Sequence, residues 1–196
     1  MLNNDRETAL HISCKQYRAD MIKSLLVYAK NINTVSSFNY TPLKYLIESL
    51  QPTKVPVAIN LIQCGADCNL IHFKNFVRYN QTDTFDEHLT CIEHVFKIYE
   101  NHFKTKPELK LLIDFLEIII NSGYKLCLND VNIFKVTPLF NQFTTQRSLF
   151  LNYYNAPNLL VNLCRIKIRS LLNKPFLNSI QCLNIPLFMK EFLYFK

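Results

Sequence analysis

A short motif recurs along the first two thirds of the chain. Thr8-Ala-Leu-His11 is followed 33 residues later by Thr41-Pro-Leu-Lys44, and a third copy, Thr137-Pro-Leu-Phe140, lies further on. A second motif, Gly65-Ala-Asp-Cys-Asn69, begins 24 residues after Thr41. Self-similarity at such a period indicates a solenoid, in which each repeat buries its apolar face only against its neighbours.

The residues of the motif have distinct physical roles. Threonine suits the N-cap of a helix, because its hydroxyl accepts a hydrogen bond from a backbone N–H of the first turn. Pro42 and Pro138 suit the first helical position, where a missing donor costs little. The leucine that follows, such as Leu43, is expected in the core. Gly65 can adopt the left-handed conformation that ends a helix.

The motifs predict an all-α fold with about four irregular repeats. Thr90-Cys-Ile92 replaces the Thr-Pro-Leu motif in the third repeat, after a long polar insertion at residues 70–89. His11 is expected to bond the turn beside Thr8, which is a structural role. The fourth repeat is expected to start at Thr137. The expected helices lie near residues 8–15, 19–29, 41–50, 55–63, 90–103, 107–121 and 147–153.

Composition limits the possible functions. Two glycines in 196 residues exclude glycine-rich phosphate loops and disfavour an all-β fold with many tight turns. The polar start is no signal peptide, and the longest apolar stretch, residues 111–120, is too short and too charged to cross a bilayer. Seven cysteines without a Cys-x-x-Cys pair are expected to be free thiols. The protein is therefore expected inside the cell, in the cytoplasm or the nucleus.

The net charge of +7 is concentrated at the end of the chain. Residues 157–196 carry six Lys and Arg against one Glu, whereas residues 1–156 carry sixteen against fourteen acidic residues. The front of the chain therefore has no basic stripe that could follow a phosphate backbone. Neither nucleic acid nor a membrane is an expected partner.

The tail contains an amphipathic helix. At about 100° per residue, one stripe of this helix is apolar and consists of Leu160, Leu163, Cys164, Ile168 and Leu171. The charged residues Arg165, Lys167 and Arg169 are expected to lie off that stripe and to remain solvated. Such a helix either covers its own domain or inserts into a groove of another protein.

Two further elements follow this helix. Leu183-Asn184-Ile185-Pro186 precedes Leu187, and the chain closes on Phe192-Leu193-Tyr194-Phe195. With the Leu-x-x-x-Cys-x-x-x-Ile element that begins at Leu160, they resemble a SOCS box over residues 157–196. Residues 1–153, with the insertion at 70–89, resemble ankyrin repeats. The whole chain is thus similar to the ankyrin repeat and SOCS box family.

This resemblance implies a substrate-recognition adaptor of a cullin–RING ubiquitin ligase. Ankyrin repeats would hold an unidentified target protein, and the SOCS box would bind elongin C and elongin B, which link to the cullin. The implied fold is an all-α ankyrin-repeat solenoid with a three-helix SOCS box. The implied subunit is non-catalytic, without cofactor or metal. Contacts to elongin C are expected from Leu160, Leu163, Cys164, Ile168 and Leu171, and contacts to the cullin from Leu183, Ile185, Pro186 and Leu187.

Several alternatives stay open at this stage. The chain could be an ankyrin scaffold without a ligase role, whose tail only caps the stack. Asn184 replaces the first proline of the cullin element, so the choice of cullin is open. No polar capping repeat precedes Thr8, so either a partner covers that end or the chain is the back part of a longer product. Phe73, Phe76 and Tyr79 fit a local core and a partner-binding finger equally well.

Metal and catalytic sites are weakly supported. Two sets of residues could converge on zinc, but each lacks a fourth ligand and finger spacing: His88, Cys91 and His94, and Cys64, Cys68 and His72. A hydrolase that uses Cys91 and His94 would lack an oxyanion donor loop. We therefore expect neither a metal site nor a catalytic centre.

Overall fold

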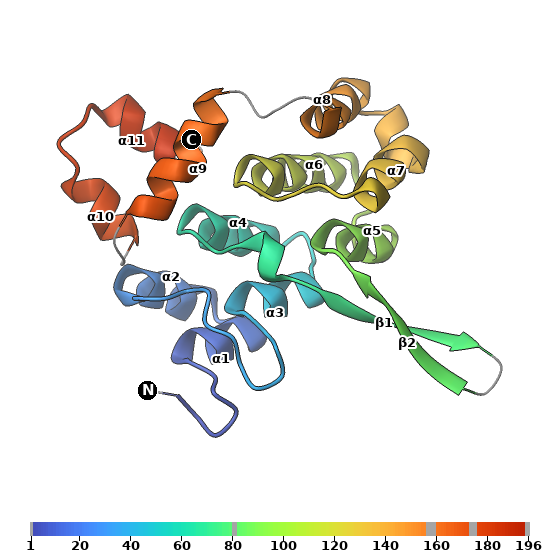
Figure 1. Ribbon diagram of the computed structural model, residues 1–196, viewed down its shortest axis with the longest axis horizontal. Helices are drawn as coiled ribbons and strands as arrows, with labels where there is room; N and C mark the ends of the chain where they lie inside the picture. Colours follow the sequence, from blue (N-terminus) through green and yellow to red (C-terminus); the bar gives the residue numbers. More distant parts are fainter. Residues whose placement is uncertain (1, 80–81, 156–159, 173–175, 195–196) are drawn as a thin grey trace.

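Eight helices are arranged in two rows (Figure 1). Each helix contacts the next one in its own row. The structure, a computed structural model, describes residues 2–79, 82–155, 160–172 and 176–194. The first row contains α1 (Ala9–Lys15), α3 (Pro42–Glu48), α5 (Cys91–His102) and α7 (Leu128–Val136), and the second row contains α2 (Ala19–Tyr28), α4 (Val55–Gln63), α6 (Lys106–Asn121) and α8 (Thr144–Asn155).

The predicted threonine N-caps begin three helices of the first row. The hydroxyl oxygen of Thr8 accepts a hydrogen bond from the backbone N–H of His11, and that of Thr41 accepts one from Lys44. Thr90 caps α5 in the same way, and Glu93 bonds back to the N–H of Thr90 over 2.6 Å. These bonds satisfy backbone donors that have no partner inside the helix. The motif therefore marks helix starts, as predicted.

The predicted helix start at Thr137 is wrong. Helix α7 begins after Cys127 and ends at Thr137. The cause is Asp130, whose carboxylate accepts a hydrogen bond from the N–H of Cys127 over 2.9 Å and so provides the cap. Thr137 ends α7 and makes no side-chain cap bond, and Pro138 opens a short 3-10 turn, η2 (Pro138–Asn141).

One continuous apolar core runs through both rows. Leu46 of α3, Leu61 of α4, Val95 of α5 and Leu116 of α6 are each fully buried in it. At the end of the stack the core is aromatic. The ring of Phe134 lies 5.5 Å from that of Phe140 and 5.2 Å from that of Phe150, between centroids. Such ring contacts add specific geometry to burial, so they hold α7, η2 and α8 together.

The insertion forms a β-hairpin. After a 3-10 turn, η1 (Cys68–Leu70), strand β1 (Phe73–Tyr79) pairs antiparallel with β2 (Thr82–Leu89) and projects from the body (Figure 1). The all-α prediction thus holds for the helical body but not for this segment. Phe73 is buried and stacks on His94 at 3.7 Å between ring centroids, which favours its role in a local core. The side chains of Phe76 and Tyr79 lie outside the described ones.

The tail forms three short helices, as predicted. They are α9 (Leu160–Leu171), α10 (Phe176–Cys182) and α11 (Leu187–Leu193), and they surround a small core of Ile180 and Leu193. The tail lies at one side of the body, where α10 contacts α2 (Figure 1). In the described part of the chain, every helix is too short or too polar to cross a membrane.

Candidate protein-docking site

Helix α9 has two faces with different surroundings. At about 100° per residue, Arg165, Ile166 and Arg169 fall on one side, and Leu163, Cys164, Ile168 and Leu171 fall on the other. The first side packs on the body and on the rest of the tail, and the second is open to solvent.

Arg169 joins the tail to the second row of helices. Its guanidinium donates hydrogen bonds to the carbonyl oxygens of Ile62 (2.8 Å) and Gln63 (3.0 Å), and to that of Leu193. Ile62 and Gln63 form the C-terminal end of α4, where helix carbonyls have no partner within the regular helix and the macrodipole favours a cation. Burial lowers the pKa of Arg169 to about 10. The prediction that this residue stays solvated is therefore wrong.

Ile166 and Arg165 complete the inward face. The φ of Gly123, in the turn after α6, is +100°, and a Cβ added there would lie 3.2 Å from Cδ1 of Ile166. Glycine therefore permits both the turn and the close approach of α9. The guanidinium of Arg165 lies 4.0 Å from the ring centroid of Phe192, so this charge is also not simply solvated. Lys167 is exposed, as predicted.

The outward face of α9 is apolar and uncovered. Leu171 is 69% exposed, Leu163 46% and Ile168 39%, and the thiol-bearing Cys164 is also exposed. Leu160 is the first residue of α9, but its side chain lies outside the described ones. A chain that used this helix only as its own lid would bury these side chains, since burial is what apolar surface gains from packing.

The proline element divides into two parts. Leu183 and Ile185 are half-buried and pack on the small tail core, whereas Pro186 is exposed and Leu187 is 71% exposed. Two neighbours that sequence reasoning missed, Phe188 and Met189, are 69% and 41% exposed. Their positions at the start of a short helix after Pro186 were the available signal. The structure thus adds a second apolar surface at the start of α11.

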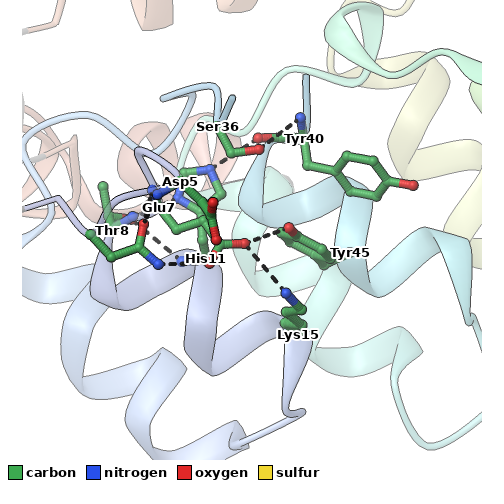
Figure 2. Close-up of polar contacts among 9 residues, drawn as sticks. Asp5, Glu7, Thr8, His11, Lys15, Ser36, Tyr40 and Tyr45 are labelled. Carbon is green, nitrogen blue, oxygen red and sulfur yellow. Dashed lines mark hydrogen bonds and ion pairs between the residues drawn. The ribbon is translucent and has the colours of Figure 1, made fainter. Parts of the chain in front are cut away.

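A polar network links the first two helix pairs (Figure 2). In its Nε2–H tautomer, His11 donates to the carbonyl oxygen of Tyr40 over 3.0 Å and accepts at Nδ1 from the N–H of Thr8 over 3.1 Å. His11 thus bonds to the turn beside Thr8. Burial lowers the pKa of His11, because the charged ring would lose its hydration.

Glu7 extends this network and was not predicted. The carboxylate of Glu7 is buried, accepts a hydrogen bond from the hydroxyl of Tyr45 over 2.5 Å and lies 3.6 Å from Nζ of Lys15 (Figure 2). The hydrogen bond from Tyr45 is the main cause that lowers the pKa of Glu7. Nothing in the local sequence pairs Glu7 with a tyrosine 38 residues later.

Among the candidate zinc and hydrolase residues, Cys91 and His94 are engaged in packing, whereas His72 is exposed. Cys91 is fully buried, and its hydrogen bond with Cys68 together with burial raises its pKa. His94 stacks on Phe73, and its Nε2 lies 3.3 Å from the carbonyl oxygen of Glu48. The side chain of His88 lies outside the described ones. Across the described ranges, no three or more His, Cys, Asp and Glu side chains are grouped to hold a metal ion.

Comparison with known families now identifies the tail. The family model of the SOCS box matches residues 157–194, which are the three helices α9 to α11 and their flanks. Ankyrin repeats are not detected by family models. Among curated proteins, none matches the chain significantly. The chain therefore carries a C-terminal SOCS box. A SOCS box implies binding to elongin B and elongin C and to a cullin, as a non-catalytic substrate adaptor of a cullin–RING ubiquitin ligase.

Proposed function

We propose that this protein recognises a target protein through an ankyrin-repeat solenoid in residues 1–153 and presents it to an elongin B/C–cullin–RING ligase through its tail. The observation that carries the proposal is the open apolar face of α9 inside the matched SOCS box. The residues proposed to contact elongin C are those of the predicted stripe: Leu160, Leu163, Cys164, Ile168 and Leu171.

The ankyrin assignment is supported by geometry and spacing. The two rows of helices, the helix starts at Thr8 and Thr41, and the Gly65 turn with φ of +98° fit stacked helix pairs of this kind. The hydrogen bond from His11 to the carbonyl of Tyr40 links the first proposed repeat to the loop that precedes α3. A stack of repeats presents an extended surface for a partner, which suits a receptor for a protein target.

The energetics favour a protein partner for α9. Full burial of one large aliphatic side chain contributes about 1.5–3 kcal/mol, and Leu163, Ile168 and Leu171 are all available for it. The small side chain of Cys164, between them on the same face, lets a partner approach the helix closely. The contacts of Arg169 and Ile166 hold the helix in place beforehand, which reduces the ordering cost of binding.

Contact with the cullin is proposed for a separate surface. Pro186 and Leu187 are exposed, whereas Leu183 and Ile185 support them from the small tail core. Asn184 stands where a proline would fix the backbone conformation before binding. We therefore expect weaker affinity for the cullin than a proline at this position would give.

Co-expression with elongin B and elongin C tests the proposal. The wild-type chain should co-purify with both proteins, and the double variant Leu160→Asp with Cys164→Asp should not, because it places two carboxylates in an apolar interface. The matched control is Leu128→Asp with Val136→Asp, which alters two exposed apolar residues of α7. Equal recovery of elongins with both double variants would refute the assignment.

The scaffold without a ligase role is supported by one observation. The inward face of α9 covers the C-terminal end of α4 and the turn at Gly123, as a capping helix would. A protein of this kind would remain monomeric and soluble without elongins, although 69% of Leu171 is exposed. Sedimentation of the chain expressed with and without elongins distinguishes the two functions.

A further inference from the structure

A groove lies between α9, the end of α8 and the segment that follows α6. It has a volume of about 390 Å³ and is bounded by the turn after α6, the end of α8 and the first turns of α9. Ile166 and Gly123 line it, and a Cβ added at Gly123 would lie 3.2 Å from Ile166. Its walls are formed by Tyr124, Lys125, Leu126, Tyr153, Tyr154 and Leu163.

This groove is continuous with the apolar face of α9. Leu163 belongs to both surfaces and is 46% exposed, and Tyr154 on the opposite wall is 43% exposed. Apolar surface therefore continues from the SOCS box onto the end of α8. A protein seated on Leu163 would also lie against the mouth of the groove.

The walls of the groove are held in place by polar contacts. The hydroxyl of Tyr153 donates to the side-chain oxygen of Asn121 over 2.8 Å, and the hydroxyl of Tyr124 donates to the buried carboxylate of Asp130 over 3.3 Å. The N–H of Lys125 donates to the side-chain oxygen of Asn69 over 2.8 Å. The two tyrosine rings are thus fixed in advance, as in sites that are formed before their ligand binds.

We propose that elongin C, the partner of α9, also inserts an apolar segment into this groove, so that the end of α8 and the segment after α6 form part of the elongin-binding surface. This inference rests on the proposed function. The continuity through Leu163 favours elongin C over the target protein as the occupant. A SOCS box would then bind elongin C more tightly when it is attached to this body.

Titration of the purified full-length protein with the elongin B/C heterodimer tests the inference. Tyr154→Arg places a charge in the groove and leaves every residue of the predicted α9 stripe unchanged, so affinity should fall about tenfold or more. Tyr28→Arg is the matched control, because Tyr28 is an exposed tyrosine near the end of α2 (77% exposed). This control should bind within about twofold of the wild type.

A second measurement guards against a folding defect in the variant. Amide hydrogen exchange of the wild-type protein should slow at residues 124–126 and 153–155 when the elongins bind. Two results would overturn the inference about the groove and leave the proposed function intact. In the first, the wild type binds and Tyr154→Arg binds with the same affinity. In the second, the wild type binds without protection of these amides. Failure of the wild type to bind elongins would overturn both.

Discussion

The guanidinium of Arg169 lies 2.8 Å from the carbonyl oxygen of Ile62, a residue 107 positions earlier in the chain. This bond and its neighbour at Gln63 tie the SOCS box to the middle of the helical body. Because Arg169 and Leu171 point to different sides of α9, the same helix can be held by the body and still present an apolar face. The fixed placement relates the proposed surface for the target to the proposed surface for the ligase.

Replacing Arg169 should loosen the tail. Arg169→Met keeps a long apolar stem but leaves the carbonyl groups of Ile62, Gln63 and Leu193 without these donors. We expect a loss of about 2–3 kcal/mol in the free energy of unfolding. Urea unfolding measures it, with Lys167→Met as the control on the exposed side of the helix. Equal urea midpoints for the two variants would contradict a stabilising role for the hydrogen bonds of Arg169.

Gly123→Ala should destabilise the protein more than Gly65→Ala, because Gly123 contacts α9. Both glycines have a positive φ, so each alanine costs about 1–2 kcal/mol in backbone strain. At Gly123 the new methyl group also meets Ile166, at 3.2 Å, which adds about 1–3 kcal/mol of overpacking. Thermal unfolding of both variants gives the comparison. An equal loss would mean that Ile166 does not pack there.

Stability should fall as the pH drops below neutral. Burial lowers the pKa of His11 below its ordinary value of 6.5, so the folded protein binds fewer protons than the unfolded chain. Stability is therefore full above about pH 6.5 and decreases towards the lower pKa of the folded state. Glu7, whose pKa is also lowered, adds a loss at more acidic pH. Urea midpoints at pH 7.5 and 5.5 measure the slope.

A matched pair of variants assigns this slope. His11→Gln should reduce it, because the glutamine does not titrate, and His102→Gln, at an exposed position, should leave it at the wild-type value. Each unit of pKa difference between folded and unfolded states corresponds to about 1.4 kcal/mol. A wild-type slope in both variants would remove His11 from the explanation.

Thiol alkylation should report the docking face. Cys164 and Cys182 are exposed, whereas Cys14 and Cys64 are buried, and burial raises their pKa values to about 12 and about 11. Thiolates react, so Cys164 and Cys182 should be alkylated first under native conditions. Bound elongins should protect Cys164 and leave Cys182 reactive, as read by peptide mass spectrometry. Unchanged alkylation of Cys164 in the complex would place the interface elsewhere.

The sequence predicts helix starts well where the signal is local. Thr8, Thr41 and Thr90 each cap a helix through a bond to a residue three positions on, so a short motif carries the information. Cys127 gave no such signal, because cysteine is not a usual N-cap. The carboxylate of Asp130 fixes this start, and it also accepts a hydrogen bond from Thr90 over 2.7 Å, a partner 40 residues away.

Periodicity predicts the apolar stripe of α9 but not the partner of its other face. Arg169 looks like a solvated charge in the sequence, since its acceptors are main-chain carbonyls that any residue could supply. The sequence predicts the hairpin segment only as a polar insertion. The pairing of Phe73 with Leu89 depends on contacts between the two strands, which the local pattern does not specify. Contacts of this kind, between residues distant in the sequence, cannot be predicted from local patterns.

The most direct test of the central claim compares two exposed thiols of the same tail. Cys164 lies on the outward face of α9, and Cys182 ends α10. In calorimetric titration with elongin B/C, Cys164→Asp should weaken binding by about a hundredfold or more, because a carboxylate would be buried in an apolar interface. Cys182→Asp should change the affinity by less than about threefold. Equal affinities for the two variants would contradict docking through the outward face of α9.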